Sequence, residues 1–310
     1  MKVSIVTPSF NQARYLEQTI RSVLGQGYGA LEYFVIDGGS TDGSVEIIKQ
    51  YTSQLSGWVS EKDNGQADAI NKGLRQTSGE IVAWLNSDDY YLPGTIARAV
   101  DVFTRHPEAG LVYGNVLSVD ATSQPFNLQT FQPFNLTNLM SFRIISQPAV
   151  FMRRAVLERT GLLDESYHLL LDHHLWLRMA RLAPMIYIPE TLAAARYHAE
   201  AKNLARTAEF GREAYRLVDW MQSDPAFADD FKRHEKRIRG GAQRLDAFYL
   251  LDGGHYAVAL KTYLKALTNS PQVVLRESHR LLFAMLGMLG LGNLRQIYMD
   301  LRRKVKMGIR

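Results

Sequence analysis

Two adjacent carboxylates, Asp88 and Asp89, follow directly after the apolar run 81–85, which is typical of a buried strand. Side by side, their negative charges repel each other unless water or a cation relieves them. The sequence contains no GxxxxGK(S/T) phosphate loop, and the turn after the first expected strand has no glycine for a GxGxxG loop. A divalent cation held by carboxylates is therefore a candidate for neutralising a bound phosphate.

Other polar side chains occupy positions where ligands bind to open α/β sheets. Asp37 ends the second expected strand, at the kind of strand end where such sheets bind ligands. The alternative is that Asp37 and Asp42 are turn and helix-capping residues, which Asp commonly provides. On the next expected helix, Asp68, Asn71 and Lys72 are spaced to share one face, either as a ligand contact or as a solvated ion pair.

The elements that must position these residues alternate between strand and helix. Strands are expected at 3–6, 33–36, 58–60, 80–85, 111–113, 148–152 and 185–188. Helices are expected at 15–24, 43–51, 66–76, 93–105 and 169–180. The Gln-, Asn- and Pro-rich stretch 121–147 is expected to form a long loop that serves as a lid or substrate wall. This alternation predicts a parallel sheet with helices on both faces.

Composition limits the classes of function. The chain of 310 residues is 46% hydrophobic and 22% charged, as in a globular protein, and it has no cysteine. Disulfides, thiolate zinc sites and cysteine nucleophiles are therefore excluded. The N-terminus offers no signal peptide, and the longest apolar stretch, residues 281–292, is too short to span a bilayer. A cytoplasmic location is expected.

Four motifs in collinear order, VSIVTPSFNQ, VIDGGSTDGS, DNGQADAINKGL and WLNSDD, resemble an inverting family 2 glycosyltransferase with the A-type (GT-A) fold. The resemblance covers roughly residues 1–200. It implies an α/β fold with a mostly parallel sheet and helices on both faces. The implied catalytic domain is 1–204, with a nucleotide-binding half (1–115) and an acceptor half (116–204).

The resemblance also implies which residues bind the donor nucleotide. These are residues of the first-strand loop, the second-strand aspartate, three residues of the third motif and one of the acidic pair: Thr7, Pro8, Ser9, Asp37, Asp68, Asn71, Lys72 and Asp88. Asp37 would accept a hydrogen bond from the base. Asp89, with Asp88, would bind Mn²⁺ or Mg²⁺ beside the donor diphosphate. Such a cation would offset the repulsion of the pair and the charge that develops on the leaving group.

An inverting transfer needs a base that removes the proton of the acceptor hydroxyl. The resemblance places this carboxylate at Asp172, in the segment DHHLWLR, with Asp164 and Glu165 as alternatives. This chain departs from its relatives in having Leu171 before the aspartate and histidines after it. The two histidines are not expected to bind zinc together, because neighbours on a helix point apart. One of them is expected to contact the acceptor or lie at the edge of the core.

The acceptor half carries further family-like segments, SQPAVF and RYHAEAK. Acceptor or diphosphate contacts are implied for Gln147, Trp176, Arg196 and Lys202. His198 is implied as a metal ligand through a neutral imidazole, or as a diphosphate contact. The alternative for the Arg-Tyr-His run is an ordinary surface segment.

Residues 205–310 are expected to form a helical region, including a helical pair at 247–271. Charge is uneven along the chain: residues 1–200 have 16 Lys and Arg against 20 Asp and Glu, whereas 201–310 have 20 against 11. The apolar run 281–292 followed by basic residues resembles an interfacial helix at the inner face of a membrane. The alternative is a core helix with a solvated basic end. Nucleic acid is not expected, because aromatic residues are not interleaved among the basic ones.

The sequence thus predicts a metal-dependent inverting glycosyltransferase. Its partners would be a nucleotide-diphosphate sugar donor and a polysaccharide, saccharide or lipid-linked acceptor. Two alternatives stay open. One is a catalytically degenerate transferase domain that acts as a scaffold, and the other is a sugar-phosphate nucleotidyltransferase. The second alternative requires a Gly- and Arg-rich loop after the first strand, which this sequence lacks.

Overall fold

A computed structural model describes residues 1–275, 277–294 and 298. The chain divides into two compact units, one of residues 1–135 with 145–196, and a second of residues 136–144 with 197–310. The boundary expected from the sequence, between residues 204 and 205, therefore falls within the second unit. The basic tail, residues 302–310, lies outside the described residues.

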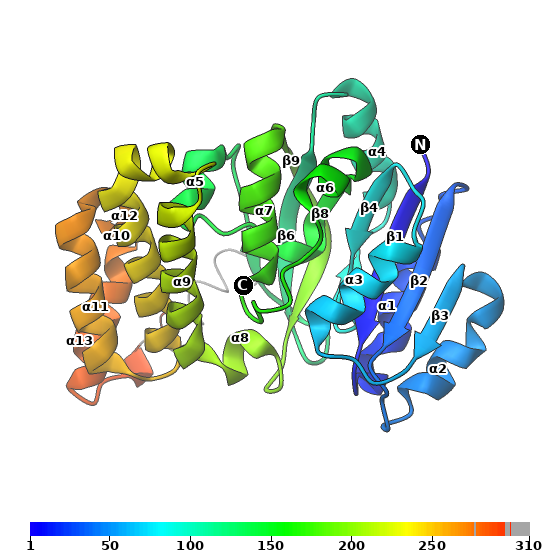
Figure 1. The fold of residues 1–310 in the computed structure, drawn as a ribbon. Coiled ribbons are helices and arrows are strands. Elements are labelled where there is room, and N and C mark those ends of the chain that lie inside the picture. The colour runs from blue at the N-terminus through cyan, green and yellow to red at the C-terminus, as the bar shows by residue number, and fades with distance from the viewer. Residues whose placement is uncertain (276, 295–297, 299–310) are drawn as a thin grey trace. The chain divides into compact units, whose positions relative to one another are not determined.

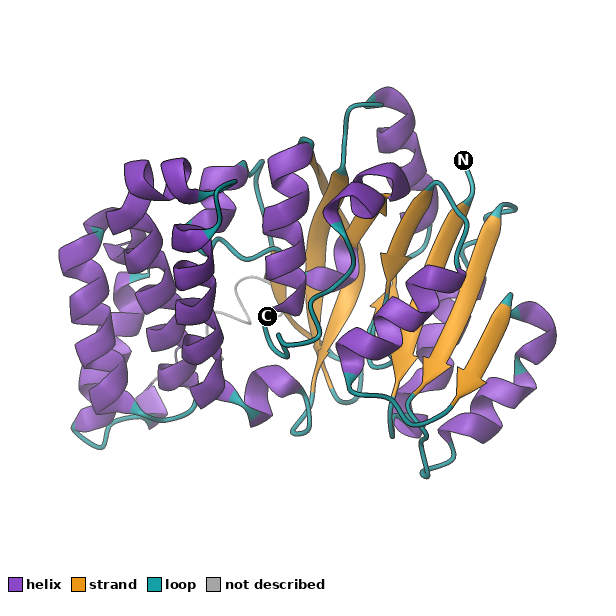
Figure 2. Cartoon of the chain, viewed as in Figure 1, coloured by secondary structure: helices purple, strands orange, loops and turns teal. Residues whose placement is uncertain are grey.

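The first unit is an α/β unit in which strands and helices alternate (Figures 1 and 2). Its strands are β1 (Val3–Ser9), β2 (Leu31–Asp37), β3 (Gly57–Ser60), β4 (Ile81–Trp84), β5 (Tyr90–Tyr91), β6 (Leu111–Asp120), β7 (Pro125–Gln129), β8 (Val150–Arg153) and β9 (Met185–Tyr197). Its helices are α1 (Ala13–Leu24), α2 (Ser44–Gln50), α3 (Gln66–Gln76), α4 (Thr95–Arg105), α6 (Arg154–Thr160) and α7 (Leu171–Leu182). Short 3-10 turns lie at η1 (Thr52–Gln54) and η2 (Gln147–Ala149).

The nine strands of the described residues form one sheet, in the order β3-β2-β1-β4-β8-β6-β9-β5, with β7 beside β6. Strands β3, β2, β1 and β4 are parallel, whereas β8 is antiparallel to both β4 and β6, and β5 is antiparallel to β9. The expected α/β class with helices on both faces is confirmed. The expectation of mostly parallel strands holds for the first half of the sheet, and the second half is antiparallel.

Side chains alternate between the two faces of each parallel strand. Val3 and Ile5 of β1 join a buried cluster with apolar residues of α1, α2 and α4. On the opposite face α3 lies unusually close to the sheet, because a Cβ on Gly73 would come within 2.3 Å of Val6 and 3.1 Å of Ile36. Figure 1 shows α3, α6 and α7 in front of the strands. Both faces of the parallel strands are therefore covered.

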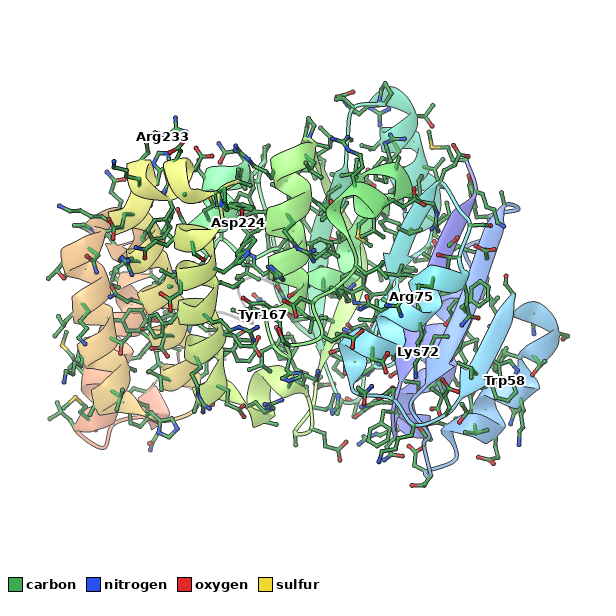
Figure 3. The ribbon with its side chains drawn as sticks, in the orientation of Figure 1. Trp58, Lys72, Arg75, Tyr167, Asp224 and Arg233 are labelled. Carbon is green, nitrogen blue, oxygen red and sulfur yellow. The ribbon has the colours of Figure 1, made fainter. Side chains whose placement is uncertain are left out.

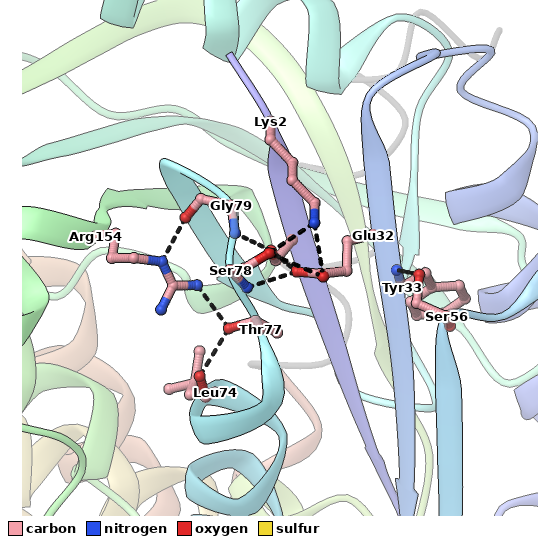
Figure 4. Close-up of polar contacts among 10 residues, drawn as sticks. Lys2, Glu32, Tyr33, Ser56, Leu74, Thr77, Ser78, Gly79 and Arg154 are labelled. Atoms are coloured by element: carbon pink, nitrogen blue, oxygen red, sulfur yellow. Dashed lines mark hydrogen bonds and ion pairs between the residues drawn. The ribbon is translucent and has the colours of Figure 1, made fainter.

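A polar cluster closes the edge of the sheet where the parallel strands begin (Figure 4). The Glu32 carboxylate accepts hydrogen bonds from the Ser4 hydroxyl (2.5 Å), the Ser78 N–H (2.7 Å) and the Lys2 ammonium (2.9 Å). Burial raises the pKa of Glu32, but these hydrogen bonds outweigh burial and bring it down to about 2. The cluster links β1, β2 and the connection between α3 and β4, at the edge opposite the acidic pair.

The stretch 121–147 is more regular than the long loop expected from its composition. It contains β7, the helix α5 (Leu136–Met140) and the first residue of the turn η2. β7 pairs antiparallel with β6, and α5 belongs to the second unit. The expectation of an irregular loop was wrong because a short strand is stabilised by its partner strand rather than by its own composition.

The second unit is helical in its described part. Its helices are α5 together with α8 (Lys202–Ala205), α9 (Phe210–Ser223), α10 (Ala228–Asp252), α11 (Tyr256–Asn269), α12 (Pro271–Leu275) and α13 (Ser278–Met288), with a 3-10 turn η3 (Thr207–Glu209). The expected helical pair at 247–271 is confirmed as the end of α10 packed against α11. A buried cluster that includes Leu251, Tyr263 and Phe283 forms part of its core. None of the described helices combines the length and apolar character needed to cross a bilayer.

Candidate active site

The acidic turn (residues 86–89) connects β4 to β5 at the edge where the parallel strands end. The Thr19 hydroxyl of α1 lies 2.9 Å from the Ser87 carbonyl and 2.6 Å from the Asp89 carbonyl. The Leu85 N–H donates to the carbonyl of Val6 on β1. The turn is therefore fixed to the neighbouring strand and helix rather than free to move in solvent.

The carboxylate of Asp89 is 6% exposed, whereas Asp88 is half-buried. One Asp89 oxygen, Oδ1, accepts the N–H of Arg196 at 2.9 Å, and Oδ2 lies 3.4 Å from the Asn86 amide nitrogen. Burial and the negative charge of Asp88 raise the pKa of Asp89 well above its usual range, and the Arg196 N–H opposes them only in part. A cation beside Oδ2 and Asp88 would favour the charged form.

Three amide side chains form a hydrogen-bonded chain beside this carboxylate. The Gln66 amide donates to Asn86 Oδ1 at 2.7 Å, the Asn86 amide to Gln147 Oε1 at 3.3 Å, and the Gln147 amide to the Trp84 carbonyl at 2.8 Å. Gln147 is 8% exposed and engages both its amide oxygen and its nitrogen. Its expected contact with acceptor or diphosphate stays a prediction, and in this geometry Gln147 orients Asn86.

The loops after β1 and β2 are joined by hydrogen bonds. The Gly38 N–H donates to the Ser9 carbonyl at 2.8 Å, the Asn11 N–H to the Ser40 hydroxyl at 2.8 Å, and the Thr41 N–H to Asn11 Oδ1 at 2.9 Å. Asn11 adopts a positive φ of 52°, which Asn tolerates better than most residues. The two loops therefore form one preorganised surface at the end of the sheet.

Asp37 is fully buried at the end of β2. Its carboxylate accepts the hydroxyls of Ser40 (2.5 Å) and Ser60 (2.7 Å) and the N–H of Ser40 (2.9 Å). These bonds match the turn-forming alternative, and base recognition by Asp37 stays a prediction. Beside it, the Ser9 hydroxyl is buried and has no hydrogen-bond partner among the described residues, whereas the Thr7 hydroxyl bonds to Tyr33 in the core at 3.0 Å. Pro8 is buried.

The start of α3 lies beside these loops. The approach is close at Gly38, where a Cβ would come within 2.4 Å of the Asp63 carboxylate. Asp68, in the first turn, accepts the Asn64 N–H at 2.9 Å and pairs with Lys72 at 3.4 Å. Figure 3 shows Lys72 and Arg75 along α3. Lys72 also pairs with Glu61 at 3.1 Å. Asp68 and Lys72 therefore form the ion pair that their spacing predicts.

Asn71 connects α3 to the loop before α7. Its amide donates to the Leu163 carbonyl (2.9 Å) and to Glu165 (3.2 Å), and its oxygen accepts the Leu163 N–H (3.0 Å). Asn71 is 1% exposed, so these contacts give it a structural role, and its expected nucleotide contact stays a prediction. The contacts bring Glu165, an alternative base, to α3. Asp164, the other alternative, accepts the hydroxyl of Ser166 in a local turn.

Asp172 lies in the first turn of α7 and is half-buried, with its carboxylate 2.7 Å from the His173 N–H. His173 and His174 are both buried, and the ring of His174 lies 4.6 Å from that of Tyr167. Trp176 is fully buried and stacks on Trp84 with ring centres 5.2 Å apart. The ring of Trp176 is therefore part of the core in this structure, and its expected acceptor contact stays a prediction.

The remaining predicted residues lie on either side of the chain position, between residues 196 and 197, where the first unit ends. Arg196 is the last residue of the first unit and is 4% exposed. His198, which is buried, and Lys202, which is exposed at the start of α8, belong to the second unit. The described residues contain no group of three or more His, Asp or Glu side chains arranged to hold a metal. The implied metal role of His198 stays a prediction.

Comparisons with known proteins cover different parts of the chain. The model of the family "Glycosyl transferase family 2" matches residues 4–161, about half of the chain. The chain belongs to glycosyl transferase family 2. An uncharacterized glycosyltransferase of Nostoc sp. is 34% identical over 132 residues, which are 40% of this chain and 41% of the relative. The chain thus matches less than half the length of that relative. Asp172, Arg196 and His198 lie beyond residues 4–161, which the family model matches.

Two solved structures share the GT-A fold of this family 2 member. S. aureus TarS 1–349 in complex with UDP-GlcNAc is 17% identical, with a TM-score of 0.61 over 99% of this chain and 91% of that one. The mannosyltransferase PcManGT from Pyrobaculum calidifontis, in complex with GDP-Man and Mn²⁺, is 19% identical, with a TM-score of 0.61 over 94% of this chain and 86% of that one. The GT-A fold expected from the sequence is confirmed.

The donor set of this family 2 chain fits a hard divalent cation. Asp88 and Asp89 supply carboxylate oxygens, and Mg²⁺ commonly binds one or two carboxylates together with substrate phosphates. Sequence reasoning found this pair but missed the groups that orient it, Thr19, Gln66 and Asn86. Of these, only Asn86 carried a signal, since it is a polar residue at a strand end beside two aspartates.

Proposed function

We propose that this chain is a metal-dependent, inverting glycosyltransferase that moves a sugar from a nucleotide-diphosphate donor to a saccharide or lipid-linked acceptor in polysaccharide or glycolipid synthesis. The observation that carries the proposal is the acidic turn. Burial and Asp88 disfavour ionisation of Asp89, yet the turn is held rigidly at the edge where parallel strands end. A cation at this edge would offset the negative charge of the two aspartates and of a bound diphosphate.

In this proposal each residue has a separate task. Asp89 and Asp88 hold Mn²⁺ or Mg²⁺, which would neutralise charge on the leaving diphosphate. The joined loops after β1 and β2, with Asp68 and Lys72, form the nucleotide pocket. Asp172 takes the proton of the acceptor hydroxyl as the hydroxyl oxygen attacks the anomeric carbon. The donor type is supported by the structural neighbours, which were crystallised with UDP-GlcNAc and with GDP-Man.

We further propose that the protein works in the cytoplasm, at the inner face of a membrane. The support is the sequence of the apolar run followed by cations, together with α13. In α13, Phe283 and Ala284 are buried, whereas Leu282, Met285 and Met288 are exposed. One side of the helix thus packs in the second unit, and exposed apolar residues precede the basic tail. The helix therefore has the buried side of a core helix and the exposed apolar residues of an interfacial helix.

The test is hydrolysis of UDP-sugars and GDP-sugars in Mn²⁺, with Asp89→Asn beside the wild type. Because the amide cannot ligate the metal as a carboxylate does, we expect at least about a hundredfold lower rate. Asp101→Asn, which removes an exposed carboxylate of α4 that pairs with Arg105, is the matched control and keeps the wild-type rate.

Calorimetry with UDP and GDP, with and without Mn²⁺, separates this proposal from the scaffold alternative. The proposal expects one nucleotide to bind, and more tightly with metal. If neither nucleotide binds, the chain is a degenerate transferase domain. Equal rates for wild type and Asp89→Asn would remove the metal role of the acidic turn.

A further inference from the structure

Arg196, near the end of β9, lies next to the acidic turn. β9 pairs antiparallel with β5, with Ala194 opposite Tyr90, and this register brings Arg196 beside Asp88 and Asp89. The Arg196 N–H donates to Asp89 Oδ1 at 2.9 Å, and its side-chain Nε donates to the Asp88 carbonyl at 2.9 Å. The main chain of Arg196 therefore contacts the carboxylate of Asp89, and its side chain contacts the main chain of Asp88.

The other guanidinium nitrogens connect the acidic turn to two further segments. Nη1 lies 3.2 Å from the Asp120 carbonyl and 2.9 Å from the Ser123 hydroxyl, in the turn between β6 and β7. Nη2 donates to Gln18 Oε1 on α1 at 2.7 Å. The guanidinium also lies 4.6 Å from the ring centre of Tyr15 and 5.6 Å from that of Tyr90.

Ser123 provides an independent observation on this arrangement. Its backbone adopts a φ of 67°, in the left-handed region that is unfavourable for a residue with a side chain. Its hydroxyl contacts both Arg196 (2.9 Å) and Gln18 (3.3 Å). Strain of this kind persists only where the surroundings determine the conformation, and here they place a hydroxyl against the buried arginine.

We infer that Arg196 is a positioning residue, which orients Asp88 and Asp89 for the metal and does not contact the donor diphosphate. All three guanidinium nitrogens donate to groups of the protein, and the side chain is 4% exposed. Because the guanidinium is a planar fork, it reaches the carbonyl, hydroxyl and amide partners at once. Lysine keeps the positive charge but cannot bond in these three directions. The inference rests on the proposed function.

The experiment compares Arg196→Lys with a matched control, Arg153→Lys. Arg153 also donates to main-chain carbonyls, those of Ala109 (2.8 Å) and Phe103 (3.1 Å), and lies 5.0 Å from the Phe103 ring centre. In the sheet, Arg153 of β8 lies opposite Ile81 at the start of β4. The acidic turn follows the other end of β4. The two substitutions therefore remove similar hydrogen bonds and aromatic contacts near opposite ends of β4.

Binding of Mn²⁺ is measured by the loss of the free-Mn²⁺ electron paramagnetic resonance signal, with UDP or GDP present. We expect Arg196→Lys to weaken Mn²⁺ binding about tenfold or more, because loss of a residue that orients metal ligands commonly lowers metal affinity by this much. Arg153→Lys should leave Mn²⁺ binding unchanged. Nucleotide affinity at saturating Mn²⁺ should stay within about twofold of wild type, because the arginine does not touch the diphosphate. Melting temperatures report any general loss of stability.

Each other outcome has a defined meaning. Wild-type Mn²⁺ affinity in Arg196→Lys overturns the positioning role and leaves the proposed function intact. A loss of nucleotide affinity that persists at saturating Mn²⁺ assigns Arg196 to the diphosphate and also overturns the inference. If the wild type binds no Mn²⁺ with either nucleotide, the proposed function fails, and the inference fails with it.

Discussion

At the scale of single residues, the site contains groups whose backbone conformation or burial is unfavourable by itself. Their hydrogen bonds to neighbouring residues offset this unfavourable free energy. Ser123 is one example, with a strained backbone and a hydroxyl that holds Arg196. Asp89 is another, with a carboxylate whose pKa is raised by burial and by Asp88. Neither residue is explained by the stability of the fold alone. Both are explained if the acidic turn must be held in one orientation.

The strain at Ser123 leads to a prediction about two variants. Ser123→Ala loses the hydroxyl and keeps the positive φ, whereas Ser123→Gly loses the hydroxyl and relieves the strain. After the greater entropy of glycine in the unfolded chain is counted, the glycine variant should be more stable than the alanine variant by about 0.5 to 1 kcal/mol. Urea unfolding of both proteins measures the difference. A glycine variant that is no more stable than the alanine variant would contradict the strain.

At the scale of elements, the sequence predicts helices and strands whose apolar residues follow a regular period. It misses elements that depend on contacts with segments far away in the chain. The expected helix 66–76 coincides with α3, because its apolar and small residues follow one helical face. The strand β7 was missed, since its pairing with β6 is not a property of its own residues. The same reason applies at the site. The acidic pair is visible in the sequence, but the bond between Asn86 and Gln147 joins residues far apart in the chain.

The opposite edge of the sheet gives a prediction on pH. The pKa of Glu32 is lowered from 4.5 to about 2, so its carboxylate stabilises the fold above pH 4.5. This contribution is lost progressively as pH falls from about 4.5 through about 2, because protonation removes the charge that Lys2 and the Ser78 N–H stabilise. Since solvent reaches part of the carboxylate, we expect a loss of about 1 to 2 kcal/mol. Figure 4 shows the contacts involved.

Glu32→Gln should remove this part of the acid sensitivity. Urea unfolding of the wild type and the variant, compared at about pH 5 and about pH 2.5, measures it. Glu46→Gln, which changes an exposed glutamate of α2, is the control and should lose stability with acid as the wild type does. An equal acid-induced loss in the Glu32 variant and the wild type would show that the hydrogen bonds of Glu32 do not lower its pKa.

At the scale of the whole molecule, the two units differ in how far the sequence predicts them. The family motifs predict the α/β unit and its site, whereas residues 136–144 belong to the helical unit despite their place within the first. The reason is packing: Gly241 of α10 lies so close to Ser141 that a Cβ would come within 2.2 Å of its carbonyl oxygen. Arg244 also donates to the Phe142 carbonyl at 2.9 Å. Contacts of this kind leave no periodic trace in the sequence.

The proposed membrane contact is tested on the intact protein. We expect it to bind vesicles that contain anionic lipids, more weakly as salt increases, and not neutral vesicles, because each cation near an anionic surface contributes about 1 kcal/mol. Replacing three tail cations by glutamate, Arg302→Glu, Arg303→Glu and Lys304→Glu, should reduce binding by at least about a hundredfold. The same change in charge on exposed cations of α10, Lys232→Glu, Lys236→Glu and Arg237→Glu, is the control. Equal losses in the two triple variants would attribute binding to net charge and exclude a specific role of the tail, since only a local contact distinguishes two proteins of the same charge.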